Sequence, residues 1–190
     1  MARSGLEFGC TRDYKRSMQH DKPESNAVPD TPRSTSGVLE LADFCAALQS
    51  GQRLIGIDVG TKTLGLALSD VGRSIASGLE TIRRKKFTLD VEVLFARVAE
   101  HGVGGLVIGL PLNLDGREGP RSQSTRAFAR NLAKLTPLPM LLWDERLSTA
   151  EAERMLIASD ASRRRRAEVI DKMAATIILQ TALDRMRHAA

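Results

Sequence analysis

Three acidic positions in the chain have neighbours that could make them chemically active, and the first is Asp58. It ends an apolar, partly β-branched run that contains Leu54, Ile55 and Ile57, and Gly60 follows it. Such a run predicts a central strand that is buried on both faces. A carboxylate at that place is costly unless something pairs with it. Asp58 is therefore either a structural acid satisfied by turn amides or a ligand for a cation.

The second position is the pair Asp144 and Glu145, which directly follows the apolar run 139–143. In open α/β sheets, ligands gather beyond the ends of the strands. A carboxylate pair at a strand end is therefore a candidate for binding or catalysis. The alternative is a turn in which the acids form a local ion pair with Arg146.

The third position is Asp171, whose neighbours three, four and seven residues later are Ala174, Ala175 and Ile178. At helical spacing these residues share one apolar face, so Asp171 faces the core side of the last helix. Small alanines would let that helix approach a sheet closely. An ion pair is the alternative, but Lys172 is adjacent in sequence and points elsewhere on the helix. We favour a cation or an active site.

The three acids predict a metal centre if they converge. Hard cations such as Mg²⁺, or Mn²⁺ in its place, require clustered carboxylate oxygens. Two such ions can activate water and stabilise the leaving oxygen of a phosphodiester. Whether the acids converge depends on the fold rather than on their spacing in the sequence.

The pattern of apolar residues predicts three strands followed by alternating helices and strands. Gly60 and Gly65 are expected to break the first strand and permit a tight return, and Gly102 to end a helix. This order predicts a mixed five-stranded α/β sheet with helices on both faces, as in the ribonuclease H-like architecture. The predicted strands are 53–58, 64–68, 75–82, 105–109 and 139–143, and the predicted helices are 38–48, 87–100, 120–135, 148–157 and a last one that ends near residue 187.

Composition limits the class of protein. Residues 1–36 are polar and proline-containing, which predicts a disordered extension before one domain over 37–190. No apolar run of about 18 residues is present, so no membrane contact is expected. Two distant cysteines indicate a reduced, cytoplasmic setting. The net charge of +5 permits a polyanionic partner.

Four motifs, in this order, resemble those of the YqgF family, also called RuvX, whose members are described as pre-16S rRNA nucleases and as Holliday junction resolvases. The resemblance covers about residues 53–187. One motif alone would be weak, and the four together are highly specific. They are 57–67 (IDVGTKTLGLA), 109–116 (GLPLNLDG), 143–149 (WDERLST) and 170–175 (IDKMAA).

The resemblance implies a ribonuclease H-like fold and a metal-dependent nuclease site. Carried over motif by motif, Asp58, Glu145 and Asp171 would be the catalytic acids and the ligands of Mg²⁺ or Mn²⁺. The sequence departs from the related RuvC resolvases in one place. Those are expected to carry a glutamate just after the fourth strand, whereas this chain has no acid there until Asp115. The second acid must then come from Asp144 or Glu145.

Several polar residues could contact nucleic acid, either structured RNA or branched DNA. The loop at 109–117 is alternatively plain turn chemistry, and the arginine run alternatively a solvated face. Beside a nuclease site, both gain weight as phosphate contacts. The candidates are Lys62, Asn113, Arg117, Arg163, Arg164, Arg165 and Arg166.

Three functions compete on this sequence. The first is an endonuclease that processes the 5′ end of pre-16S rRNA in association with a ribosome precursor, or that resolves Holliday junctions. The second is an ATPase or sugar kinase, because residues 57–62 resemble a phosphate loop of that superfamily. No second such loop is present, and the chain is short for two domains. The third is a non-catalytic assembly factor. The choice between RNA and DNA and the oligomeric state stay open.

Overall fold

The computed structural model describes residues 37–113, 115–148 and 163–189. By its contacts the chain divides into the units Met1–Thr31 and Pro32–Ala190, and the described residues all belong to the second unit. The predicted disordered extension at 1–36 lies outside the described residues. So does the predicted helix beyond Ser148.

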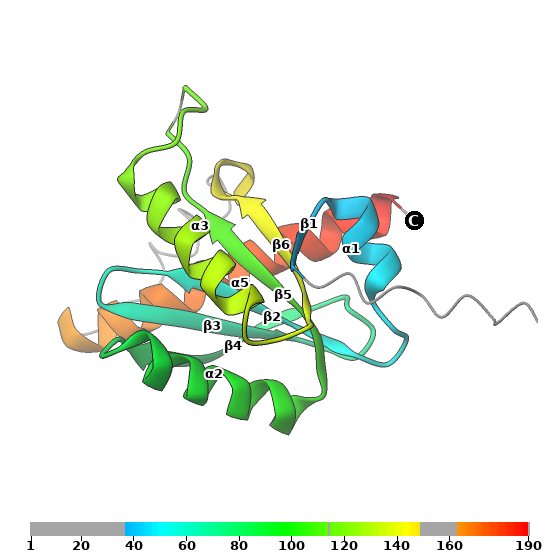
Figure 1. Ribbon diagram of the computed structural model, residues 1–190, viewed down its shortest axis with the longest axis horizontal. Coiled ribbons are helices and arrows are strands. Elements are labelled where there is room, and N and C mark those ends of the chain that lie inside the picture. Colours follow the sequence, from blue (N-terminus) through cyan, green and yellow to red (C-terminus); the bar gives the residue numbers. More distant parts are fainter. Residues whose placement is uncertain (1–36, 114, 149–162, 190) are drawn as a thin grey trace, which may run out of the picture. The chain divides into compact units, whose positions relative to one another are not determined.

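A six-stranded sheet forms the centre of the described part, with strand order β1-β6-β5-β2-β3-β4 (Figure 1). In chain order the elements are β1 (Gly37–Leu39), α1 (Leu41–Ala47), β2 (Arg53–Val59), β3 (Thr63–Ser69), β4 (Ala76–Arg83), α2 (Phe87–His101), β5 (Val103–Leu110), α3 (Pro120–Ala133), β6 (Pro139–Asp144), a 3₁₀ turn (Glu145–Ser148) and α5 (Arg163–Ala189).

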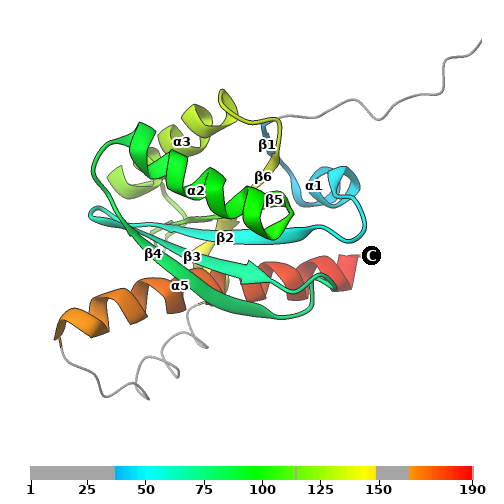
Figure 2. The same ribbon diagram turned by 90° about the horizontal axis from the view of Figure 1, so that it is seen from below.

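The sheet is mixed. Strands β2, β3 and β4 form an antiparallel meander, while β5 lies parallel to β2 and is followed outward by β6 and β1, also parallel. Helices α2 and α3 cover one face, and α5 covers the other (Figure 2). The predicted ribonuclease H-like architecture is confirmed. Within the described part of the chain, no helix is long and apolar enough to cross a membrane.

Strand β2 shows why the sheet needs helices on both faces. Ile55 and Ile57 point into the core beneath α2 and α3, whereas Leu54 points into the core beneath α5, and all three are fully buried. Alternate side chains of a strand face opposite sides, so a strand covered twice is apolar throughout. The prediction of a central, doubly buried strand is confirmed.

The N-terminal edge of the sheet corrects two predictions. A sixth strand is present, because β1 pairs with β6, Val38 lying beside Met140. Val38 therefore belongs to a strand, and the helix predicted from it begins only at Leu41. Its apolar stripe is real, since Phe44 is fully buried in the core beneath α5. A three-residue strand exists only through its partner, so no local pattern could predict it.

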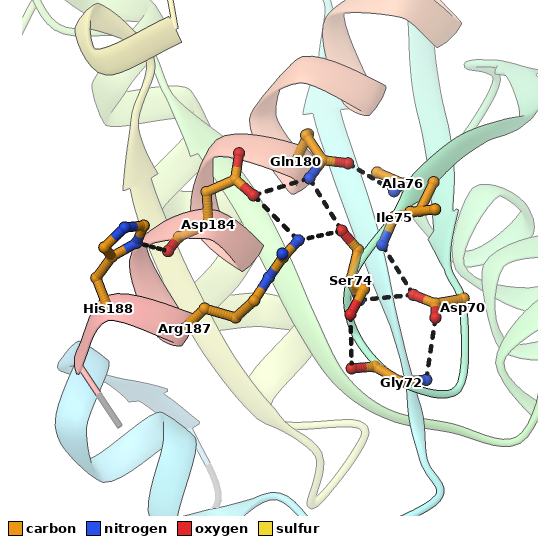
Figure 3. Close-up of polar contacts among 9 residues, drawn as sticks. All are labelled: Asp70, Gly72, Ser74, Ile75, Ala76, Gln180, Asp184, Arg187 and His188. Atoms are coloured by element: carbon orange, nitrogen blue, oxygen red, sulfur yellow. Dashed lines mark hydrogen bonds and ion pairs between the residues drawn. The ribbon is translucent and has the colours of Figure 1, made fainter.

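The C-terminal half of α5 is tied to the turn between β3 and β4 (Figure 3). Gln180 accepts a hydrogen bond from the Ala76 amide at 2.8 Å and donates one to the Ser74 carbonyl at 3.1 Å. Arg187 also donates to the Ser74 carbonyl, and Asp184 accepts from both Gln180 and Arg187. These contacts fix one end of the helix against the sheet and so help to set where Asp171, nearer its other end, can lie.

Candidate active site

Asp58 lies on β2 where the strand meets α5. It pairs with Gly65 of β3 and belongs to the same face as Leu54, the face that α5 covers. The pKa of the Asp58 carboxyl is raised to about 6, mainly by burial and then by the nearby Asp171 carboxylate, while Arg121 acts in the opposite direction. An acid that loses solvent beside another acid is harder to ionise. Asp58 and Asp171 are therefore neighbours, which the sequence alone left open.

The position of Asp171 depends on glycines of the sheet. A Cβ atom on Gly65 would lie 2.1 Å from the Asp171 carbonyl oxygen, and one on Gly56 would lie 2.6 Å from Leu179 Cβ. The helix backbone can rest this close only where strand residues have no side chain. The predicted role of Gly65 as a strand-breaking turn residue is wrong, because it lies inside β3. It opens the space that brings Asp171 beside Asp58.

Glu145 begins the 3₁₀ turn directly after β6. Its carboxylate reaches over β5, where a Cβ on Gly109 would lie 2.7 Å from Glu145 Oε1 and 2.5 Å from Ile178 Cδ1. Burial raises the pKa of Glu145 to about 7, and the Asp58 charge contributes in the same direction. Arg121 lowers this pKa and Asp144 raises it slightly. Asp58 is thus coupled to both acids, because Asp171 raises the pKa of Asp58 and Asp58 raises the pKa of Glu145.

Asp144 has a different environment from its neighbour. It accepts hydrogen bonds from the Arg146 backbone amide at 3.0 Å and from the Arg146 guanidinium at 2.7 Å. The guanidinium bond is the main reason that the pKa of Asp144 is lowered. The local ion pair considered for this segment therefore exists, and it engages Asp144. Glu145 is the member of the pair whose charge meets Asp58.

Arg121 is a residue that the sequence analysis missed. It is exposed in the first turn of α3, and it lowers the pKa of both Asp58 and Glu145. The next residue, Ser122, is fully buried and donates a hydrogen bond to the Pro111 carbonyl. This bond fixes the start of α3 beside the end of β5. The only sequence signal was Pro120, which is common at the first position of a helix.

Three of the predicted nucleic-acid contacts lie in loops at the same end of the sheet. Lys62 is exposed in the turn between β2 and β3, and Asn113 and Arg117 are exposed in the loop after β5. Since β2 and β5 are parallel, these loops lie at one edge. The Arg117 guanidinium is 3.7 Å from Asp115. Arg163, Arg164, Arg165 and Arg166 begin α5, but their side chains lie outside the described residues.

The arrangement of these acids and their chemistry give different answers on whether they fit a metal ion. In the described residues, no three or more His, Cys, Asp or Glu side chains are arranged so that they could hold a metal ion. The chemistry does fit, because Asp171 disfavours the charge of Asp58, and Asp58 in turn disfavours the charge of Glu145. A divalent cation would relieve that repulsion, and carboxylate oxygens are its preferred ligands. The donor set suits Mg²⁺ or Mn²⁺, although the side chains as they stand do not form a complete site.

Fold and site together define a class: a ribonuclease H-like α/β protein with acids gathered over the central strand. The sequence profile of the RuvX family, described as a Holliday junction resolvase, matches residues 52–185. The chain belongs to the RuvX family, and the resemblance drawn from the four motifs is confirmed.

Relatives in this family have a common name. A protein of Rhodobacter capsulatus called "Putative pre-16S rRNA nuclease" is 60% identical over 146 residues, which cover 77% of this chain and 92% of the relative. A protein of Methylocella silvestris with the same name is 58% identical over 151 residues, covering 80% and 94%.

Two solved structures of resolvases are also similar to this chain. RuvC of T. thermophilus, in complex with a Holliday junction substrate, aligns with a TM-score of 0.46 and 14% identity over 72% of this chain and 96% of that one. The yeast mitochondrial Holliday junction resolvase Ydc2 aligns with a TM-score of 0.43 and 11% identity, over 78% and 86%.

Proposed function

We propose that this protein is a metal-dependent endonuclease that cleaves structured RNA, and that it processes the 5′ end of pre-16S rRNA in the cytoplasm. Membership of the RuvX family makes it a nuclease, a hydrolase of nucleic-acid phosphodiester bonds. The choice of RNA follows the name that its relatives carry. The observation that carries the proposal is the electrostatic coupling of Asp58 to Asp171 and to Glu145, with raised pKa values at Asp58 and Glu145.

In this proposal Asp58, Glu145 and Asp171 hold Mg²⁺ or Mn²⁺. When bound, the metal supplies an activated water and stabilises the charge on the leaving oxygen. Asp58 has little freedom, because it is part of β2 and faces Gly65. Asp171 is set in place by a helix that rests on glycines. The backbone of both residues is therefore held in place, and fixed positions of charged groups are a condition for efficient charge stabilisation.

The remaining site residues deal with the substrate's negative charge. Arg121 offsets part of the charge of Asp58 and Glu145 and is exposed, so it can also meet a phosphate that approaches them. Lys62, Asn113 and Arg117 extend from neighbouring loops, and Arg163 to Arg166 are assigned to the same task. Hydrolysis consumes one water and breaks one phosphorus–oxygen bond. The site binds RNA within a ribosome precursor.

A second candidate, the resolution of Holliday junctions, is favoured by the description of the family. The two candidates use the same acids and differ in the nucleic acid that the loops accept. They are separated by assaying the purified protein with Mg²⁺ or Mn²⁺ on two substrates. One is a 16S rRNA fragment with its 5′ precursor extension, and the other is a four-way DNA junction.

We expect cleavage of the precursor RNA and none of a matched RNA that begins at the mature 5′ end. Cleavage of the DNA junction but not of the precursor RNA would mean that the substrate is DNA rather than RNA. Tight binding of the precursor with no more cleavage than the Asp58→Asn variant would identify a non-catalytic assembly factor and overturn the proposal.

A further inference from the structure

A second run of basic residues, Arg83 to Lys86, follows β4 and lies outside the motifs discussed so far. Arg84 differs from the other three because its side chain has a structural role. Its Nη1 donates to the Gly60 carbonyl at 2.7 Å, and its Nε lies 3.9 Å from Oδ2 of the buried Asp90. Arg84 therefore braces the turn that follows Asp58.

The other three residues of the run are exposed to solvent, as is Lys62 in the neighbouring turn. The Arg84 amide donates to the Lys62 carbonyl at 2.9 Å, which brings Lys62 next to the run. We call Lys62, Lys85 and Lys86 the basic strip.

The lysines of the strip differ from many arginines of the described surface. Among the described residues, Lys62, Lys85 and Lys86 take part in no ion pair. Several arginines elsewhere do lie within ion-pair distance of a carboxylate, namely Arg97, Arg117, Arg126, Arg146 and Arg187. These three lysines thus keep their positive charge outside the ion pairs of the described residues. Such a surface attracts polyanions.

Helix stability does not explain the two lysines of the run. Lys85 and Lys86 immediately precede α2, where the helix dipole disfavours positive charge. The helix start is already served by Asp90, which accepts the Lys85 backbone amide at 3.0 Å. That contact is made by the backbone amide, so it does not depend on the lysine side chain. The start of the helix therefore does not account for the positive charge at position 85.

The strip lies at the same end of the sheet as Asp58. Asp58 pairs with Gly65, and two residues back along β3 Thr63 pairs with Arg83. Two residues along a strand correspond to about 7 Å, and the two strand spacings from β2 to β4 add about 10 Å across the sheet. Successive phosphates of one nucleic-acid strand are separated by about 3.4 Å along the axis of a duplex. A strand with one phosphate at Asp58 would therefore place a phosphate only a few nucleotides away against the strip.

We propose that the basic strip binds the phosphate backbone of an RNA arm that leaves the active site across the β2–β3 turn toward the start of α2. The inference rests on the proposed function for the direction of the arm. Lysine ammonium groups act as point charges rather than as base readers, so this contact holds the arm without selecting its sequence. The strip lengthens the footprint of the substrate beyond the scissile phosphate.

The test substitutes Lys85 and Lys86 together by Gln and measures binding of the fluorescein-labelled precursor RNA by anisotropy without divalent metal, over a range of salt concentrations. The matched control is Arg130→Gln with Lys134→Gln, which removes the same charge from exposed positions at the far end of α3. Thermal melts of both variants should equal that of the wild type.

We expect the Lys85 and Lys86 variant to bind about tenfold more weakly at about 0.1 M salt and its log–log salt slope to fall by about 0.7–0.9 per lost contact. The control should match the wild type. Cleavage by the variant at saturating RNA should be unchanged, because neither lysine contacts the acids.

An unchanged salt slope, or an equal loss of RNA affinity in the control, would contradict the proposal that the strip binds RNA. Because binding is measured without metal, the result is separate from that of the nuclease proposal. If RNA binding depends on the strip but the wild type does not cleave, only the nuclease proposal is contradicted. If the wild type cleaves but binding does not depend on the strip, only the proposal for the strip is contradicted.

Discussion

Asp58 and Asp70 begin the same tripeptide, Asp-Val-Gly, near the ends of adjacent antiparallel strands. Asp70 is exposed and folds back on its own turn. Its carboxylate accepts backbone amides of Gly72 at 3.2 Å, Ser74 at 2.6 Å and Ile75 at 2.8 Å (Figure 3). These bonds lower the pKa of Asp70. Asp58 instead faces α5 among other acids, and its pKa rises to about 6.

The comparison separates the two interpretations that the sequence left open for Asp58. The structural acid satisfied by turn amides is found at Asp70, and the acid held near other carboxylates is found at Asp58. The three residues are the same, so the difference comes from what lies across the strand. Asp58 lies opposite Gly65 and beneath α5, whereas Asp70 lies beyond its strand in solvent. Burial disfavours the charged form, and amide donors favour it.

The largest effect is expected on turnover, when the comparison is tested at Asp58. Asp58→Asn should lower turnover of precursor RNA by about a thousandfold or more, because a lost metal ligand costs several kcal/mol of transition-state stabilisation. The matched Asp70→Asn variant should keep its turnover and lose only thermal stability, since its oxygens serve the turn. Single-turnover cleavage and thermal melts of both variants provide the measurement. Near-normal turnover by Asp58→Asn would remove that residue from the mechanism.

The second prediction uses pH, because the two aspartates should act with opposite signs. Asp58 and Glu145 have folded pKa values of about 6 and about 7, above their ordinary values. The metal-free folded protein then binds more protons than the unfolded chain between about pH 4 and pH 7, so these groups lower its stability as pH rises through that window. Because the repulsion between them is shared, the combined loss is on the order of 3 kcal/mol.

Asp70 contributes stability above its unfolded pKa and loses that contribution as pH falls through its lowered folded pKa. Urea unfolding at several pH values in EDTA checks both signs. Asp58→Asn should flatten the fall between about pH 4 and pH 7, and so should Mg²⁺, which offsets the carboxylate charges. A wild-type curve that rises through this window would contradict the raised pKa values.

The third prediction applies the same contrast to adjacent acids. Glu145→Gln should lower turnover by about a hundredfold and weaken Mn²⁺ binding, because its charge meets that of Asp58. Asp144→Asn should cost less than about fivefold, since it mainly loses an exposed pair with Arg146. Calorimetry with Mn²⁺ and cleavage rates decide the order. The reverse order would move the second acid of the site to Asp144.

The smallest effect concerns how α5 reaches the sheet. Gly65→Ala should destabilise the protein by about 1–3 kcal/mol and displace Asp171, because the added Cβ would lie 2.1 Å from the Asp171 carbonyl oxygen. Gly78→Ala is the control, with its nearest contact at 3.3 Å to Lys172 Cβ under the same helix. Denaturant midpoints and cleavage rates of the two variants test this explanation. Equal, small effects would mean that α5 can shift without loss.

The sequence by itself determined much of this protein. The continuous apolar runs predicted the buried strands, because a strand covered on both faces needs apolar residues at every position. Gly102 was predicted to end α2, and it adopts the left-handed conformation with φ 62°. The four motifs gave the family, and they included Asp58, Glu145 and Asp171 before any contact was known. These are local properties, so a local pattern can carry them.

Only the tertiary structure decided which acid meets which. The separation of Asp58 from Asp70, and of Glu145 from Asp144, depends on pairings and packing between segments far apart in the chain. The same holds for the β1–β6 pairing, for Gly65 beneath α5, and for Arg121 beside the acids. The charge and solvent around a carboxylate are set by its neighbours in space, and the residues adjacent in sequence contain no record of them.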